Sequence, residues 1–121
     1  MELGSDKTSP TVALSSPVDG GTVVKDTAGT VEWTITEVGG VDISTIVYGD
    51  TFSIINTTVP ASAALVPGSL AYNGTTKKVT FTPTDNWTAS DTFQAIVTTG
   101  LRDTSGNRLA AIKVEQFSAT V

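Results

Sequence analysis

Apolar and polar residues alternate along several short segments of this 121-residue chain. The clearest alternation covers residues 30–36, where Val31, Trp33 and Ile35 would face a core and the intervening residues would face solvent. Residues 91–99 repeat the pattern. Further strands are expected over residues 11–15, 22–24, 51–56, 69–72, 77–82 and 111–121. About seven to nine short antiparallel strands at this spacing predict an all-β sandwich.

Turn-forming residues and breaks in the alternation separate these strands. Asn73-Gly74 predicts a hairpin between residues 69–72 and 77–82. Residues 43–47 fit either a helical turn or a strand, and residues 59–66 fit either a loop or an edge strand. Between Val114 and Phe117 the alternation shifts phase, which predicts a β-bulge in the last strand.

The loop over residues 101–109 is the most distinctive segment. Leu101 and Leu109 bracket a polar stretch, as two anchors in a core would. Asp103 can accept hydrogen bonds from nearby backbone N–H groups, and Gly106 and Asn107 suit positive φ. These residues predict a structured connection between two strands, with an architectural role for Asp103, Gly106 and Asn107.

The same region carries a family resemblance. The stretch FTPTDNW…DTFQAIVTTGLRDTSGNRLA resembles the C-terminal half of bacterial Ig-like domains of the S-layer and surface-protein type. That family shows T-F-T-P, then a strand with Tyr or Phe, then D-x-x-G-N-x-L. These places are filled by Phe81, Pro83, Phe93, Asp103, Gly106, Asn107 and Leu109. Weaker matches cover residues 10–12, 16–20 and 33–46, so the resemblance spans roughly residues 6–121. The chain departs from the pattern by an inserted Gly39-Gly40 and by Ile35 in place of Phe.

The resemblance implies an immunoglobulin-like β-sandwich over residues 9–121. Residues 1–8 then form an N-terminal linker or residues left from cloning. It implies a non-catalytic spacer module of a larger bacterial cell-surface or secreted protein, located extracellularly. Its partners would be neighbouring domains of the same polypeptide, and the isolated chain would be a monomer. Two alternatives remain: an adhesin-type module that binds a cell-surface glycan or protein, and an accessory domain of a secreted hydrolase.

The composition and net charge limit the classes of partner that the chain is expected to bind. Apolar residues make up 39% and charged residues 16%, as in one globular domain. The net charge is −5, so a phosphate backbone would be repelled and nucleic-acid binding is not expected. No apolar run approaches the length of a membrane span, and the N-terminus lacks the pattern of a signal peptide. The absence of cysteine fits a bacterial surface module that relies on its core rather than on a disulfide, and it equally fits a cytosolic protein.

Catalytic candidates are few. The chain has no histidine, the commonest general base. Asp85 and Asp91 could form a carboxylate pair, although both also suit solvated turns. No G-x-S-x-G or S-x-x-K motif occurs. The sequence therefore predicts that the chain is not an enzyme and needs no cofactor.

The sequence contains candidate residues for two kinds of binding site, a calcium site and a sugar-stacking site, and each of these residues also fits a structural role. Oxygen ligands for a structural calcium ion could come from Asp6, Asp103 and Asn107, joined by Asp19 and Asp42 at one end of the sandwich. No D-x-D-x-D spacing supports this site, and the same residues serve well in turns. A sugar could stack on an exposed aromatic ring, for which the candidates are Trp87, Tyr48 and Tyr72. The preferred interpretation places Trp33 in the core and packs Trp87 over the end of the sandwich.

Overall fold

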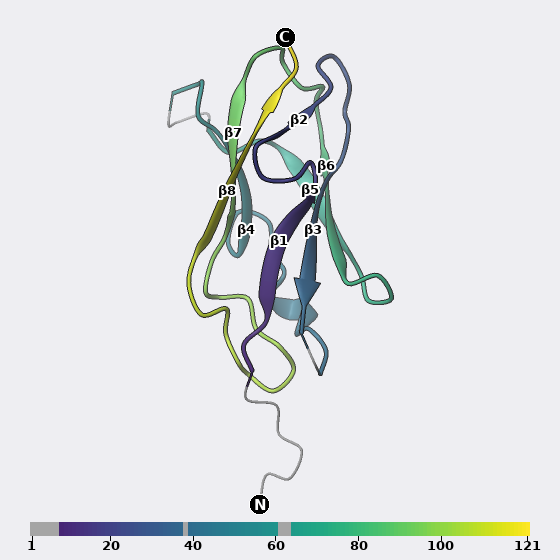
Figure 1. The fold of residues 1–121 in the computed structure, drawn as a ribbon, viewed down its shortest axis with the longest axis vertical. Helices are drawn as coiled ribbons and strands as arrows, with labels where there is room; N and C mark the ends of the chain where they lie inside the picture. The colour runs from purple at the N-terminus through teal and green to yellow at the C-terminus, as the bar shows by residue number, and fades with distance from the viewer. Residues whose placement is uncertain (1–7, 38, 61–63) are drawn as a thin grey trace, which may run out of the picture.

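Two four-stranded sheets face each other in the computed structural model, which describes residues 8–37, 39–60 and 64–121 (Figure 1). The strands are β1 (Thr11–Ser16), β2 (Gly21–Val23), β3 (Val31–Thr36), β4 (Phe52–Asn56), β5 (Gly68–Asn73), β6 (Lys78–Pro83), β7 (Thr92–Val97) and β8 (Lys113–Ala119). One 3-10 turn, η1 (Ile43–Thr45), precedes β4. In the described part of the chain no helix is long and apolar enough to cross a membrane. The predicted all-β sandwich is confirmed.

The strand order is that of an immunoglobulin domain. One sheet has the order β1-β3-β6-β5 and the other β2-β8-β7-β4. Between β1 and β2 the chain crosses from the first sheet to the second, so β2 pairs with β8 in parallel, from Gly21↔Phe117 to Val23↔Ala119. The expectation of antiparallel strands throughout is therefore wrong for this pair. The reason is that the chain changes sheet here without reversing its direction.

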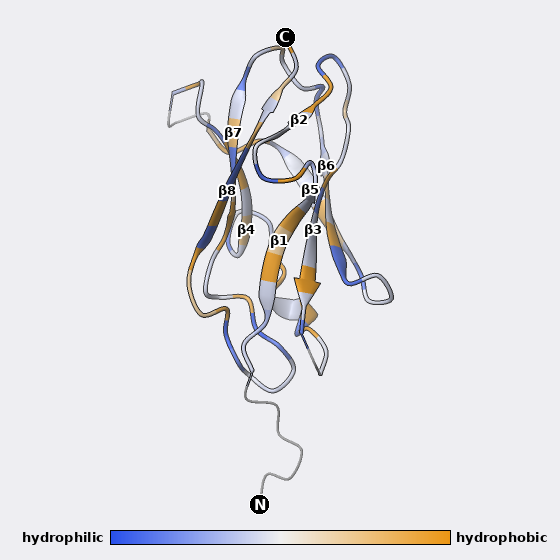
Figure 2. Cartoon of the chain, viewed as in Figure 1, coloured by the Kyte–Doolittle hydropathy of each residue, from blue (hydrophilic) through white to orange (hydrophobic). Residues whose placement is uncertain are grey.

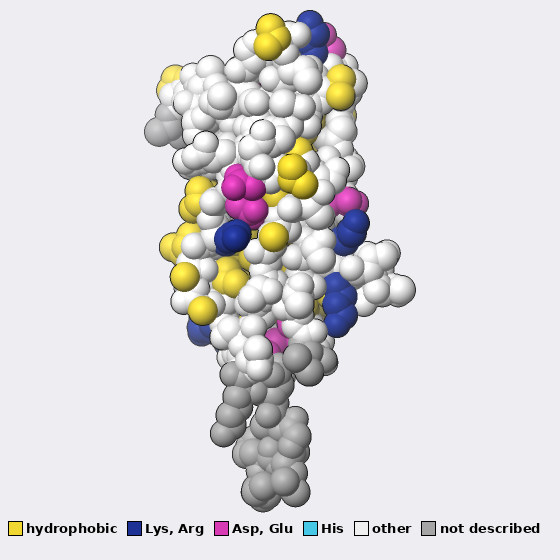
Figure 3. Space-filling model, viewed as in Figure 1, with side chains coloured by type: hydrophobic (Ala, Val, Ile, Leu, Met, Phe, Trp, Pro, Cys, Tyr) yellow, Lys and Arg dark blue, Asp and Glu magenta, His cyan; other side chains and the backbone are white. Residues whose placement is uncertain are grey.

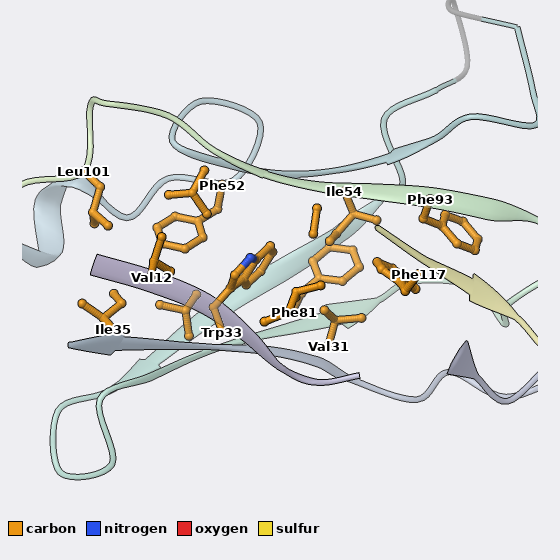
Figure 4. Close-up of a cluster of buried hydrophobic side chains, with 14 of the residues drawn as sticks. Val12, Val31, Trp33, Ile35, Phe52, Ile54, Phe81, Phe93, Leu101 and Phe117 are labelled. Atoms are coloured by element: carbon orange, nitrogen blue, oxygen red, sulfur yellow. The ribbon is translucent and has the colours of Figure 1, made fainter. Parts of the chain in front are cut away.

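The core lies between the sheets and consists of the residues that the alternation placed inside. Trp33 is fully buried in its centre, and its ring meets that of Phe52 edge-on, with centroids 5.0 Å apart (Figure 4). Val31 and Ile35 flank Trp33 on β3 and are also buried. Hydrophobic residues recur along β1 and β3 (Figure 2). The predicted core position of Trp33 is confirmed.

The predicted bulge in β8 is wrong. Its register with β7 is continuous from Thr92↔Ser118 to Val97↔Lys113. The phase shift has another cause: Glu115 takes an inward position, while Val114 faces solvent. Burial of Glu115 is possible because its Oε1 accepts a hydrogen bond from the backbone N–H of Leu14, at 2.8 Å. A register shift does occur, unpredicted, in β1 between Leu14 and Ser16.

The structure shows the conformation of three further segments: the hairpin at Asn73, residues 43–47, and the described part of residues 59–66. The hairpin at Asn73 is confirmed, and its tightness comes from the Asn73 side chain, whose Oδ1 accepts N–H bonds from Thr75 and Thr76. Residues 43–47 begin with the 3-10 turn η1. Of residues 59–66, the stretch at Leu65 forms a single bridge to Ile55 of β4, whereas residues 61–63 lie outside the described residues.

The sandwich is elongated, and its ends carry different connections. At one pole β1 begins, and the loops β3–β4 and β7–β8 lie beside it (Figure 1). At the opposite pole lie Val121 and the loops β2–β3 and β6–β7 (Figure 1). The polypeptide thus enters the domain at one pole and leaves it at the other.

Candidate functional site

The loop over residues 101–109 forms a short hairpin at the pole where β1 begins. Leu101 and Leu109 are both buried, and the N–H of Leu109 donates to the carbonyl of Leu101 at 2.9 Å. Arg102 and Arg108 form a bridge between the two arms. The prediction that the two leucines anchor the ends of this loop is confirmed.

Asp103 organises the turn of this hairpin. Its side chain is almost fully buried, and Oδ1 accepts N–H bonds from Ser105 at 3.0 Å and Asn107 at 2.8 Å. Oδ2 accepts a bond from the Asn107 side-chain amide at 2.9 Å. Gly106 has a φ of 87°, a value that favours glycine. The predicted roles of Asp103 and Gly106 in shaping the turn are confirmed.

The hairpin is fastened to the β3–β4 loop. Asp103 bridges to Val41, and the N–H of Asp42 donates to the carbonyl of Arg102 at 2.9 Å. A further bond runs from the N–H of Thr104 to the carbonyl of Gly40, at 2.9 Å. The loop that connects the two sheets, β3–β4, is thereby joined by hydrogen bonds to the β7–β8 connection of the second sheet.

Glu37 supports the same end and was not recognised as a site residue from the sequence. It is buried, and its carboxylate accepts N–H bonds from both inserted glycines, Gly39 at 2.6 Å and Gly40. Gly40 adopts a φ of 122°. The insertion relative to the family pattern thus wraps the backbone around a buried carboxylate. The signal available in the sequence was an acidic residue two positions before a pair of glycines.

The calcium candidates that lie in the described part of the chain are not gathered into one cluster. Asp103 and Asn107 bind each other, Asp42 accepts the N–H of Ser44 at the start of η1, and Asp19 accepts the N–H of Gln116 on β8. Within the described ranges no three acidic side chains gather into a metal-binding group. Asp6 lies outside the described residues. The calcium site therefore stays a prediction.

The aromatic candidates differ in accessibility. Trp87 is only 3% exposed, and its indole N–H donates to the carbonyl of Gly29 at 2.8 Å. Its ring packs edge-on against Phe93 and Phe117. It fills the core near the pole opposite β1, so no ring face of Trp87 is open to stack a sugar.

Tyr48 and Tyr72 are half-buried. The Tyr48 hydroxyl bonds to the carbonyl of Val66, and its ring stacks on Phe81 with centroids 4.8 Å apart. Burial raises the pKa of Tyr48 to about 12, although the backbone N–H of Ile54, which donates to the hydroxyl oxygen at 3.3 Å, opposes the rise. Burial, and then the charge of Glu37, raises the pKa of Tyr72. Of the three aromatic candidates, only Tyr72 lies in an apolar surface groove, described below.

Asp85 and Asp91 line one shallow pocket near Trp87. Asp91 accepts a hydrogen bond from the side-chain amide of Asn56 at 2.9 Å. Asp85 is exposed. The structure therefore places the two carboxylates at the same pocket. Asp91 is hydrogen-bonded to the amide of Asn56 and not to Asp85, and an amide does not act as a general acid or base.

Comparisons with known proteins agree with this architecture. Among solved structures, the chain is similar to the S-layer protein rSbsC, with a TM-score of 0.62 and 17% identity. The similarity covers 93% of this chain and 14% of the S-layer protein, so the chain corresponds to a small part of that protein. It is also similar to CopC from Methylosinus trichosporium OB3b, with a TM-score of 0.56 and 17% identity over 91% of this chain and 94% of CopC.

At such identities these likenesses show the fold alone. No curated protein matches the chain significantly. The family model described as "Bacterial Ig-like domain" matches residues 6–120, which is nearly the whole chain. The D-x-x-G-N-x-L loop and the sheet order fit the same family. The chain belongs to the bacterial Ig-like domain family.

Proposed function

We propose that the chain is a non-catalytic spacer module of a larger bacterial cell-surface or secreted protein, in contact with neighbouring domains of the same polypeptide. The observation that carries this proposal is the position of the start of β1 and of Val121 at opposite poles of an elongated sandwich (Figure 1). A module of this shape extends a polypeptide by its own length. The likeness to part of an S-layer protein supports a surface setting.

The bonding of the polar residues supports a structural role. The buried carboxylates Glu37, Asp103 and Glu115 accept hydrogen bonds from the domain's own backbone. Such groups stiffen loops and edges and are not displayed to a substrate. On the face shown in Figure 3, basic side chains are scattered rather than gathered in one patch, which supports the expectation that nucleic acid is not a partner.

The second strand, β2, and the last strand, β8, are arranged to resist a pull along the long axis. Parallel β2 and β8 are held in register by bonds at both ends of β2: Gly20 N–H donates to Gln116 O at 2.7 Å, and Thr120 N–H donates to Val23 O at 2.9 Å. Tension between the two poles drags β2 and β8 past each other. The bonds between them are then loaded together rather than one after another.

The spacer role can be tested by length. One copy, or two copies in tandem, would be placed between two folded reporter domains, and the maximum dimension would be measured by small-angle X-ray scattering. We expect each copy to add one constant increment, equal to the long axis of the sandwich. A flexible glycine-serine linker of the same residue count serves as the control. If the second copy added no constant increment, or if the profile matched the flexible control, the spacer role would be wrong.

A further inference from the structure

Three of the four sheet edges are closed to a further strand. Along β4, residues 64–66 occupy the edge: Asn56 N–H donates to Ala64 O at 2.7 Å, and Val66 N–H donates to Ile54 O at 2.9 Å. Along β1, the register shift and the bond from Leu14 N–H to Glu115 interrupt the edge. The β2 edge has only three residues. Covered, irregular or very short edges resist pairing with another chain.

The fourth edge, β5, has none of these protections. Its sequence, GSLAYN, contains no charge and no proline. Its register with β6 is regular from Gly68↔Pro83 to Asn73↔Lys78, and in the described part of the chain no strand lies on its other side. β5 is therefore a six-residue, uncharged and open edge.

The register identifies which backbone groups face outward. Just before β5, Thr84 N–H donates to Pro67 O at 3.0 Å, so this pair is of the hydrogen-bonded kind. Antiparallel pairs alternate between bonded and non-bonded. Ser69, Ala71 and Asn73 therefore bond to β6. The N–H and C=O groups of Gly68, Leu70 and Tyr72 point away from β6, along the open edge.

An apolar groove lies beside this edge on the inner side of the sheet. It is lined by Leu70 and Tyr72 of β5, by Ile43 and Ile46 at η1, and by Gly74. Ile43 is 66% exposed, although it is one of the larger apolar side chains of the domain. A strand added to β5 would place every second side chain over this groove. Edge and groove together form one surface suited to strand addition.

We propose that this surface pairs with the same surface of a second copy of the chain. The β5 strands would lie antiparallel about a two-fold axis at Leu70, which joins two four-stranded sheets into one continuous sheet. Leu70 would face Leu70 of the second copy, and Gly68 would face Tyr72. All three outward-pointing residues of each copy thereby find partners, with about six hydrogen bonds between the strands.

The side chains are compatible with this register. Gly68 has no side chain, and the Phe81 ring of the same copy fills that space, so the Tyr72 ring of the second copy would pack beside the Phe81 ring. On the outer face, Ser69 would lie opposite Ala71, and both are small, exposed and uncharged. Although each chain carries a net charge of −5, the paired strands bring no like charges together. The pairing also covers the apolar groove of each copy with Leu70 and Tyr72 of the other.

This inference goes beyond the spacer role and does not depend on it: β5 pairing would link modules side by side, whereas the spacer role concerns the two poles. The sequence predicts a monomer instead, so sedimentation equilibrium of the 121-residue chain separates the two expectations. We expect a monomer–dimer equilibrium between micromolar and millimolar concentration.

A matched pair of variants tests the edge. Ala71→Lys puts a charge on the open edge, and Ala13→Lys puts one on the exposed face of β1, which is already blocked. Ala71→Lys should raise the dimer dissociation constant at least about tenfold, because each copy carries the charge near its counterpart across the axis. Ala13→Lys should leave it unchanged, and thermal melts should show both variants folded. A wild-type chain that stays monomeric, or equal effects of the two variants, would overturn the proposal.

Cross-linking tests the register itself, because the chain contains no cysteine. In the proposed dimer, residues 69 and 71 of different copies form a non-hydrogen-bonded pair, with Cα atoms about 4.5 Å apart, within disulfide range. A mixture of Ser69→Cys and Ala71→Cys chains should therefore form disulfide-linked dimers faster than either variant alone. Ala13→Cys serves as the control. Equal cross-linking in all samples would overturn the register, and a chain that accepts only a foreign extended peptide would assign the edge to another protein.

Discussion

Asp103 offers the sharpest test of the loop over residues 101–109. The change is Asp103→Ala, which removes the carboxylate and leaves the backbone of the turn intact. Three hydrogen-bond donors lose their acceptor: the backbone N–H groups of Ser105 and Asn107 and the side-chain amide of Asn107. The main consequence should be a loss of stability, because the turn holds Leu101 and Leu109 in the core.

The magnitude follows from these contacts. A hydrogen bond to a charged group contributes about 1.5–3 kcal/mol net, and one between neutral groups about 0.5–1.5 kcal/mol. Ser105 is exposed and Asn107 is partly exposed, so water can replace part of what their backbone N–H groups lose. We expect a loss of about 2–4 kcal/mol, at the upper end of what single substitutions usually cost. Asp103→Asn keeps one acceptor oxygen but sets its amide against that of Asn107, so its cost should be intermediate.

The assay is urea denaturation of wild type, Asp103→Ala and Asp85→Ala, each with calcium and with EDTA. Asp85 is an exposed turn residue, so its variant controls for loss of a surface charge and should change stability little. If Asp103 is architectural, its cost is the same in both buffers. If it is a calcium ligand, the cost is present in calcium and absent in EDTA, because a bound ion stabilises the native state. A calcium-dependent cost would refute the architectural role.

Three other predictions concern the core, the turn glycine and a tyrosine. Trp87→Ala should cost about 3–5 kcal/mol, as much as Trp33→Ala, because both rings are buried; a clearly smaller cost in denaturant melts would mean that the Trp87 ring is not part of the core. Gly106→Val should destabilise strongly and Gly106→Asn much less, since strain at positive φ is the obstacle and no atom lies within 4 Å of an added Cβ; equal melting temperatures would contradict this. The pKa of Tyr48 is raised to about 12 in the folded state, from an ordinary value of 10, so the unfolded chain loses its proton first. Stability should be unaffected below pH 10 and fall as the pH approaches 12, and Tyr48→Phe should weaken this dependence.

The alternation of side chains was enough to predict most strands. Residues such as Val31, Trp33 and Ile35 occur at every second position, and the two-residue repeat of a strand then leaves one face for the core. The turn at Asp103 was predictable for a similar reason, because its bonds reach only two to four residues along the chain. Features that depend on residues close in sequence can therefore be predicted from the sequence alone.

Contacts between distant segments account for what the sequence did not reveal. Glu115 breaks the alternation of β8, and only the position of Leu14, on another sheet, explains how a carboxylate can be buried there. Likewise, the parallel pairing of β2 depends on a change of sheet after β1 that no short motif encodes. Trp87 follows a turn in a polar stretch, so its neighbours give no sign that its ring reaches Phe93 and Phe117.

The candidate site shows the same division. The sequence drew attention to Asp103 and Asn107 but not to Glu37, whose bonds to Gly39 and Gly40 depend on a loop of unusual shape. The open edge of β5 also escaped notice, because an edge is defined by strand order and not by composition. A segment such as GSLAYN reads as an ordinary strand until its neighbours are known.

Single-molecule stretching tests most directly whether the domain holds its two poles apart under tension. The same chain would be pulled in two directions: between its ends, and sideways between cysteines placed at Ala13 on β1 and Ala71 on β5, the two edges of one sheet. End-to-end tension shears the parallel β2–β8 pair, so its bonds resist together, whereas sideways tension peels the edge strands one bond at a time. We expect a clearly higher unfolding force end to end. An end-to-end force equal to or below the sideways force would contradict it.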